Sequence, residues 1–175
     1  MLYTGMAWLT PLWASWGVMG SVGVIVWGTV KIVLCGSSLS FLMNTGLPTL
    51  AATAFWRFGA GWPRLFFLFF PVMAFFLFTA IVGIGPDLFF ASYWLFMPLL
   101  YFFPSVRSTL LMHAIAASLT AHMAGAFIVL FFGKPVAWAA IAPFVLSERL
   151  ITAFGMTGVA LLNRSSIGLR KQVSW

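Results

Sequence analysis

Thr109–Phe132, with the sequence TLLMHAIAASLTAHMAGAFIVLFF, contains no Lys, Arg, Asp or Glu. A helix needs about 20 mostly apolar residues to cross a bilayer, and this stretch has that length. Its apolar residues run continuously, whereas the strands of a membrane barrel alternate between apolar and polar residues. The stretch therefore predicts a transmembrane helix.

The composition of the whole chain supports the same interpretation. Of its 175 residues, 63% are hydrophobic and only 6% are charged, against about 25% charged residues in soluble domains. So few charges cannot cover a soluble fold, whereas a lipid-exposed surface needs no such cover. We expect an all-α integral membrane protein in which residues 1–175 form a single polytopic domain surrounded by the lipid bilayer.

Six apolar segments, separated by short breaks that contain Gly, Pro or Arg, predict a bundle of about six transmembrane helices. They are Leu12–Val30, Ser38–Trp56, Leu65–Gly83, Leu88–Phe103, Thr109–Phe132 and Val136–Leu162. The fourth segment is the shortest, and its Pro98 leaves open a tilted, broken or re-entrant course.

The basic residues predict the orientation of this bundle. If both termini lie on one side, that side carries Arg57, Arg64, Arg107, Arg164, Arg170 and Lys171, and the other side carries Lys31 and Lys134. The positive-inside rule then places both termini in the cytoplasm. The same rule explains the net charge of +7, so we expect no nucleic-acid partner.

Glu148 and Arg149 lie about halfway along the sixth segment. An ionisable side chain at that depth costs about 2.5–3.5 kcal/mol to insert. Adjacent residues point 100° apart on a helix, so they are not expected to share one partner face. Three roles fit the pair: a polar node within the bundle, a binding site for a ligand or ion, and a contact with another subunit.

His122 and Glu148 fall at about the same depth if the fifth and sixth helices are antiparallel neighbours, and Asn44 falls somewhat further outward. On a shared face, Asn44, His122, Glu148 and Arg149 would form a polar floor below an outward-opening cavity. Alternatively, these residues only make hydrogen bonds between helices. Asp87 follows Gly85-Pro86 and is interpreted as the N-cap or first-turn residue of the fourth helix, or as the rim of an outer site.

Small residues mark two predicted helix contacts. In the fifth segment, Ala117, Ala121 and Gly125 recur every four residues, which predicts that this helix is buried within the bundle. The first segment carries a stripe of small residues for close contact with another helix of the same chain or with a separate protein: Ala14, Gly17, Gly20 and Gly23.

Enzyme and pump classes are excluded for lack of the residues that they need. The sequence has no GxSG-type nucleophile and no phosphate-binding loop, and its two carboxylates, Asp87 and Glu148, lie at different depths. The single cysteine, Cys35, and the lack of a Cys/His cluster predict neither a metal site nor a cofactor. We expect a protein that is not an enzyme.

A chain of this size with six spans, short loops, both termini inside and a few buried polar groups resembles the substrate-binding S components of energy-coupling factor vitamin transporters. The resemblance covers the whole chain at the level of architecture. It implies a prokaryotic plasma membrane protein that captures a vitamin-like solute or a metal and depends on partner subunits for energy. It also implies that the stripe of small residues on the first helix contacts a transmembrane coupling subunit.

The same resemblance implies how a solute binds. A small, partly aromatic molecule would enter from outside and stack on Trp94, Tyr93 or Trp138. It would form hydrogen bonds with Asn44, His122, Glu148 or Arg149. The alternative, from a different class, is a non-catalytic accessory subunit of a larger membrane protein complex.

Overall fold

The structure is a computed structural model, and it describes residues 8–16, 18–35, 47–58, 64–102, 109–132 and 136–167. Within these residues the fold is all-helical and has no strand, as the sequence predicts. The elements are α2 (Thr10–Ser15), α3 (Val18–Cys35), α5 (Leu47–Phe58), α6 (Arg64–Val82), α7 (Leu88–Ser92), the 3-10 turn η3 (Tyr93–Leu95), α8 (Phe96–Phe102), α10 (Leu110–Phe132) and α11 (Trp138–Ile167).

Two of these helices are long and apolar enough to cross a membrane, judged by their length and composition. They are Leu110–Phe132 of α10 and Trp138–Asn163 of α11. The stretches Leu68–Val82 and Leu88–Leu99 are also apolar but shorter. The predicted bounds of the fifth segment agree with α10 to within one residue, and α11 continues five residues beyond the predicted end of the sixth.

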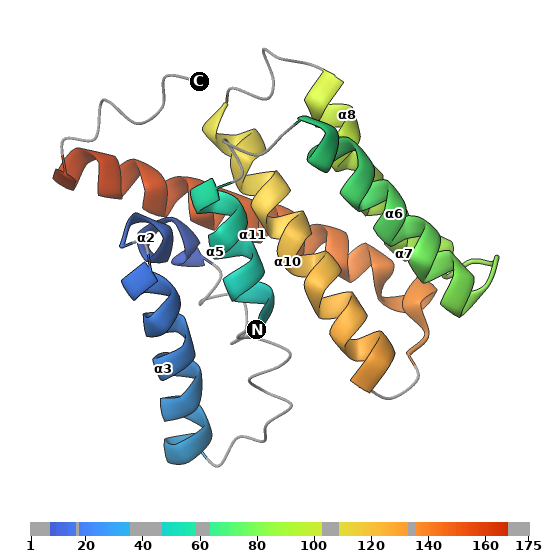
Figure 1. Ribbon diagram of the computed structural model, residues 1–175, viewed down its shortest axis with the longest axis horizontal. Helices are drawn as coiled ribbons and strands as arrows, with labels where there is room; N and C mark the ends of the chain where they lie inside the picture. The colour runs from blue at the N-terminus through green and yellow to red at the C-terminus, as the bar shows by residue number, and fades with distance from the viewer. Residues whose placement is uncertain are drawn as a thin grey trace.

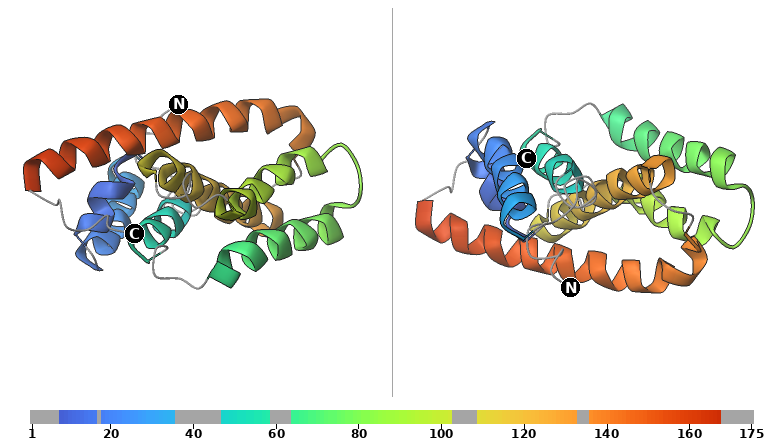
Figure 2. Two further views of the ribbon diagram at one scale, coloured as in Figure 1. Left: turned by 90° about the horizontal axis from the view of Figure 1, so that it is seen from above. Right: turned by 90° about the horizontal axis from the view of Figure 1, so that it is seen from below.

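Helix α10 occupies the centre of the fold. It runs across the middle of Figure 1, in front of α11, with α6 and α8 on one side and α2, α3 and α5 on the other. From above and below, α10 lies between α11 and α6 (Figure 2). Ala117 and Ala121 are buried, and a Cβ atom added to Gly125 would lie 3.5 Å from Cγ of Pro48 on α5. The prediction that this helix is buried within the bundle is confirmed.

The first apolar segment is not one continuous helix, and that prediction is wrong. The α2 helix ends at Ser15, and α3 begins at Val18. In a straight helix, residues seven apart are about 10 Å apart along the axis. Here a Cβ atom on Gly20 would overlap the carbonyl oxygen of Trp13, seven residues earlier. The chain therefore turns between the two helices, and Gly20 allows their close contact.

The third and fourth segments are joined by a turn at residues 83–87. Helix α6 ends at Val82, and the next residue, Gly83, has a φ of 92°, the left-handed conformation that favours glycine just after a helix. The fourth segment then follows a broken helical course, because the 3-10 turn η3 separates α7 from α8. Of the tilted, broken and re-entrant courses that the sequence allowed for this segment, the structure shows the broken one.

The side chain of Asp87 connects this turn to α11. Asp87 occupies the N-cap position of α7, as the sequence indicates, but its side chain makes no capping bond there. Its Oδ1 instead accepts a hydrogen bond of 2.7 Å from the backbone N–H of Ala139, in the first turn of α11. Asp87 was expected to cap the fourth segment, but its side chain caps α11 instead. A carboxylate at a helix N-terminus also interacts favourably with the helix dipole.

Asp87→Ala is expected to lower the free energy of unfolding by about 1 kcal/mol, the usual cost of losing an N-cap side chain. Asp87→Asn is the matched control, because its amide oxygen can still accept the bond from Ala139. Thermal unfolding followed by circular dichroism compares the two variants with the wild type. Equal stability of Asp87→Ala and wild type would contradict the role of this contact.

Candidate functional site

The side chain of His122 lies in the interior of the bundle, on the central helix α10. Only 8% of the residue is exposed. Nε1 of Trp94, in η3, donates a hydrogen bond of 3.2 Å to Nδ1 of His122. The ring of Phe90, one turn before Trp94, meets the imidazole edge-on with centroids 4.5 Å apart. The segment α7–η3 therefore holds the imidazole from two sides.

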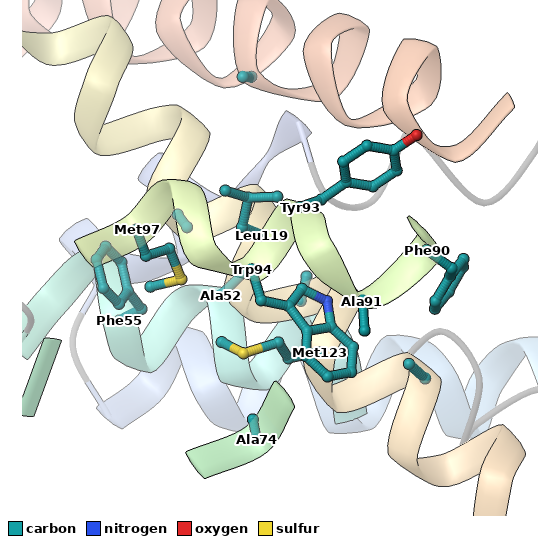
Figure 3. Packing of buried hydrophobic residues seen from close by; sticks show 14 of the residues in the cluster. Ala52, Phe55, Ala74, Phe90, Ala91, Tyr93, Trp94, Met97, Leu119 and Met123 are labelled. Atoms are coloured by element: carbon teal, nitrogen blue, oxygen red, sulfur yellow. The ribbon is translucent and has the colours of Figure 1, made fainter. Parts of the chain in front are cut away.

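Trp94 is enclosed by aromatic and aliphatic side chains. It has no exposed surface, and its ring centroid lies 5.4 Å from that of Phe78 and 5.6 Å from that of Phe127. Figure 3 shows its indole ring directed towards Met123, whereas the neighbouring Tyr93 points towards α11. Trp94 thus has no free face on which a solute could stack.

The other two aromatic residues proposed for stacking are also buried. The hydroxyl of Tyr93 donates a hydrogen bond of 3.2 Å to the carbonyl oxygen of Ala142 on α11. Trp138 is 6% exposed, and its centroid lies 4.7 Å from that of Phe90. These rings fasten α7 and η3 to the first turns of α11.

Glu148 and Arg149 form an ion pair with each other, which the argument from helix geometry did not predict. Nη2 of Arg149 lies 2.7 Å from Oε1 of Glu148. The Arg149 side chain is 16% exposed and that of Glu148 is 40% exposed. The Cα–Cβ bonds of the two residues point about 100° apart around the helix. Both side chains are nevertheless long enough for their charged ends to meet. The expectation that the two residues need separate partners is corrected.

Two buried nitrogen atoms of this region have no hydrogen-bond partner among the described residues. They are Nε2 of His122 and Nε of Arg149. A buried polar atom without a partner costs about 1–3 kcal/mol, and the cost rises in a bilayer, which contains no water to compensate it. Each of these atoms therefore calls for an explanation.

A side chain of α10 is bonded to the backbone of α11 at this level. Oγ of Ser118 donates a hydrogen bond of 3.1 Å to the carbonyl oxygen of Arg149. Ser118 lies one turn before His122 on α10, on the same side of the helix. Side chains tilt towards the N-terminus of their own helix, so the Arg149 side chain extends along antiparallel α11 towards the level of His122.

The structure places four of the five residues predicted to bind a solute in two contacting pairs. Trp94 contacts His122, and Arg149 pairs with Glu148 on the facing helix α11. The fifth, Asn44, lies outside the described residues. Sequence reasoning missed Phe90 and Ser118, although each lies four residues from a predicted site residue, Phe90 from Trp94 and Ser118 from His122. That spacing was the available signal.

The stripe of small residues in the first segment packs inside the chain. Ala14 is 3% exposed, and a Cβ atom on Gly23 would lie 3.0 Å from the Trp13 ring. Gly20 lies against the carbonyl group of Trp13. Of the two predicted contacts, with the same chain or with a separate protein, the described part of the stripe therefore makes the one within the chain. Gly17 lies outside the described residues.

Comparison of the chain with protein-family models, with curated proteins and with solved structures finds no match.

Proposed function

We propose that this chain is a polytopic membrane protein of the prokaryotic plasma membrane, with six spans and both termini in the cytoplasm. The apolar composition and the two helices long enough to span a bilayer support this architecture. The uneven distribution of basic residues supports the orientation. Apolar side chains exposed on the outer faces of α6 and α11, such as Phe69, Phe76 and Phe144, suit contact with lipid.

Within this architecture, we propose a subunit that binds a small solute for transport and depends on partner subunits for energy, as in the S components described above. One observation carries the proposal: among the described residues, Nε2 of His122 on α10 and Nε of Arg149 on α11 are buried and have no hydrogen-bond partner. A solute that reached both atoms would satisfy them. Binding would then offset the free energy that burying them costs.

In this mechanism, His122 and Arg149 form the hydrogen bonds with the solute, and the other cluster residues hold them in place. Glu148 orients the Arg149 guanidinium through their ion pair. Trp94 is fully enclosed, so it acts on the solute through His122. Release to the inner side would require a partner-driven shift of α11 against α10.

A second candidate function is that of a non-catalytic accessory subunit in a larger membrane complex. The observation that favours it is the position of Glu148, whose side chain is 40% exposed halfway along α11. Its surroundings on the outer face include Phe144 and Ile151, which are 77% and 55% exposed. A carboxylate among lipid-facing residues is costly, and a neighbouring subunit could cover it.

Native mass spectrometry of gently extracted protein tests the two candidates, with Arg149→Lys as the informative variant. Lysine keeps a positive charge for Glu148 but has no N–H at the position of Nε. We expect the wild type to carry a bound small molecule and Arg149→Lys to bind it about 10–100-fold more weakly, the effect of one hydrogen bond from a charged donor.

Arg57→Met is the matched control, because Arg57 is exposed at the end of α5, away from the cluster. It should retain the bound molecule. Partner subunits in fixed stoichiometry, without a bound molecule in the wild type, would refute solute capture and support the accessory subunit.

A further inference from the structure

We infer that Trp94 holds His122 in the form that carries its proton on Nε2, and that the site therefore selects a solute presenting a carbonyl or carboxylate oxygen. This inference rests on the proposed solute-binding function and names the chemical class of the solute. It also gives Trp94 a role as a positioning residue that acts through the imidazole.

The direction of the hydrogen bond from Trp94 determines which nitrogen of His122 carries the hydrogen. An indole N–H can only donate, so Nδ1 of His122 must accept the bond of 3.2 Å. An imidazolium carries hydrogen on both nitrogens and could not accept it. The geometry therefore describes a neutral ring whose single N–H lies on Nε2.

Nε2 of His122 then requires a hydrogen-bond acceptor. With its hydrogen on Nε2, His122 directs a donor towards a point where no described residue accepts it. The ring cannot easily turn away, because Phe90 and Trp94 both contact it. Because His122 is only 8% exposed, bulk solvent does not supply the missing acceptor.

Arg149 supplies a second buried donor. A guanidinium has donors and no acceptor. Its Nη2 is engaged by Glu148, and its Nε is buried without a partner among the described residues. A solute oxygen within reach of both donors, or the two oxygens of one carboxylate, would satisfy them together. A solute that only donates hydrogen bonds would leave both nitrogens unsatisfied.

The ion pair between Glu148 and Arg149 affects the binding of neutral and anionic solutes differently. Because Glu148 neutralises Arg149, a neutral carbonyl could bind without a net charge entering the bilayer. A carboxylate would compete with Glu148 for the guanidinium. Acetamide and acetate are therefore the two probes, since they share the acceptor oxygen and differ in charge.

Nitrogen-15 NMR of the full chain in detergent tests the inference. In the wild type, we expect His122 to show a protonated Nε2 and an unprotonated Nδ1. Trp94→Phe keeps an aromatic ring and removes the indole N–H, so we expect a mixture of both tautomers. Addition of acetamide or acetate should shift the Nε2–H resonance, with about tenfold weaker binding in Trp94→Phe. A purely structural role of Trp94 would not change the tautomer.

Phe127→Leu is the matched control, because it removes a ring that packs on Trp94 and leaves the hydrogen bond to His122 in place. It should keep the wild-type tautomer. A wild-type His122 with its proton on Nδ1, or one that responds to neither acetamide nor acetate, would overturn the inference. A solute retained in native mass spectra despite that result would leave the proposed function standing, whereas the expected tautomer without any bound solute would count against the function alone.

Discussion

Trp94→Ala is expected to lower the free energy of unfolding by about 3–5 kcal/mol, the range for removing a fully buried aromatic side chain. Trp94 has no exposed surface and lies against Phe78 and Phe127. Its loss would open a cavity on the face of α10 where Met123 is also buried. It would also remove the donor to Nδ1 of His122, whose Nε2 already has no partner among the described residues.

Two further variants separate packing from hydrogen bonding. Trp94→Phe keeps most of the ring volume and should cost about 1–3 kcal/mol, since it leaves a smaller cavity and a buried acceptor without its donor. Phe144→Ala removes an aromatic side chain that is 77% exposed and should change stability by less than about 0.5 kcal/mol. Denaturant unfolding in detergent, followed by circular dichroism, measures all three. If Trp94→Ala proves as stable as Phe144→Ala, Trp94 does not lie in a packed core.

Helices bounded by strong local signals could be predicted from the sequence. The predicted segment Leu65–Gly83 corresponds to α6 at Arg64–Val82, and Thr109–Phe132 corresponds to α10. In α6 the end is fixed by Gly83, which adopts a positive φ. A helix end of this kind depends on the conformational freedom of one glycine, so it can be predicted from the sequence.

Features that depend on contacts between distant residues could not be predicted. Apolar composition does not distinguish one helix over 12–30 from two helices that meet at Trp13 and Gly20. Likewise, the position of Asp87 indicates a cap, but its carboxylate binds Ala139, which lies 52 residues further along the chain. Both outcomes follow from tertiary packing, which local patterns do not contain.

In the candidate site, too, the residues could be predicted from the sequence, whereas the contacts between them could not. The cost of placing polar groups in a bilayer identified His122, Glu148 and Arg149 from the sequence alone. The bond between Trp94 and His122 spans 28 residues, and no local pattern pairs them. The direct pair of Glu148 and Arg149 was missed because helix geometry gives the direction of Cβ and says nothing of how far a long side chain bends.

Gly20→Ala is expected to destabilise the protein by about 3 kcal/mol, the upper end of the usual cost of overpacking. The new Cβ atom would overlap the carbonyl oxygen of Trp13, which belongs to the backbone and cannot turn aside like a side chain. The α2 helix would have to move away from α3, and with it the buried residues Thr10 and Ala14. Helix propensity acts in the opposite direction, since Ala is favoured over Gly by about 1 kcal/mol.

Gly158→Ala on α11 is the matched control, because a Cβ atom there meets nothing within 4 Å. It should stabilise the protein by up to about 1 kcal/mol through propensity alone. The same substitution is thus expected to have opposite signs at two helical glycines, and thermal unfolding of the two variants in detergent measures both. A stabilised Gly20→Ala would mean that α2 and α3 do not meet at Trp13 and that the first segment is one straight helix. The stripe of small residues would then be free to contact a partner subunit, the alternative that the packing of Gly20 against Trp13 disfavours.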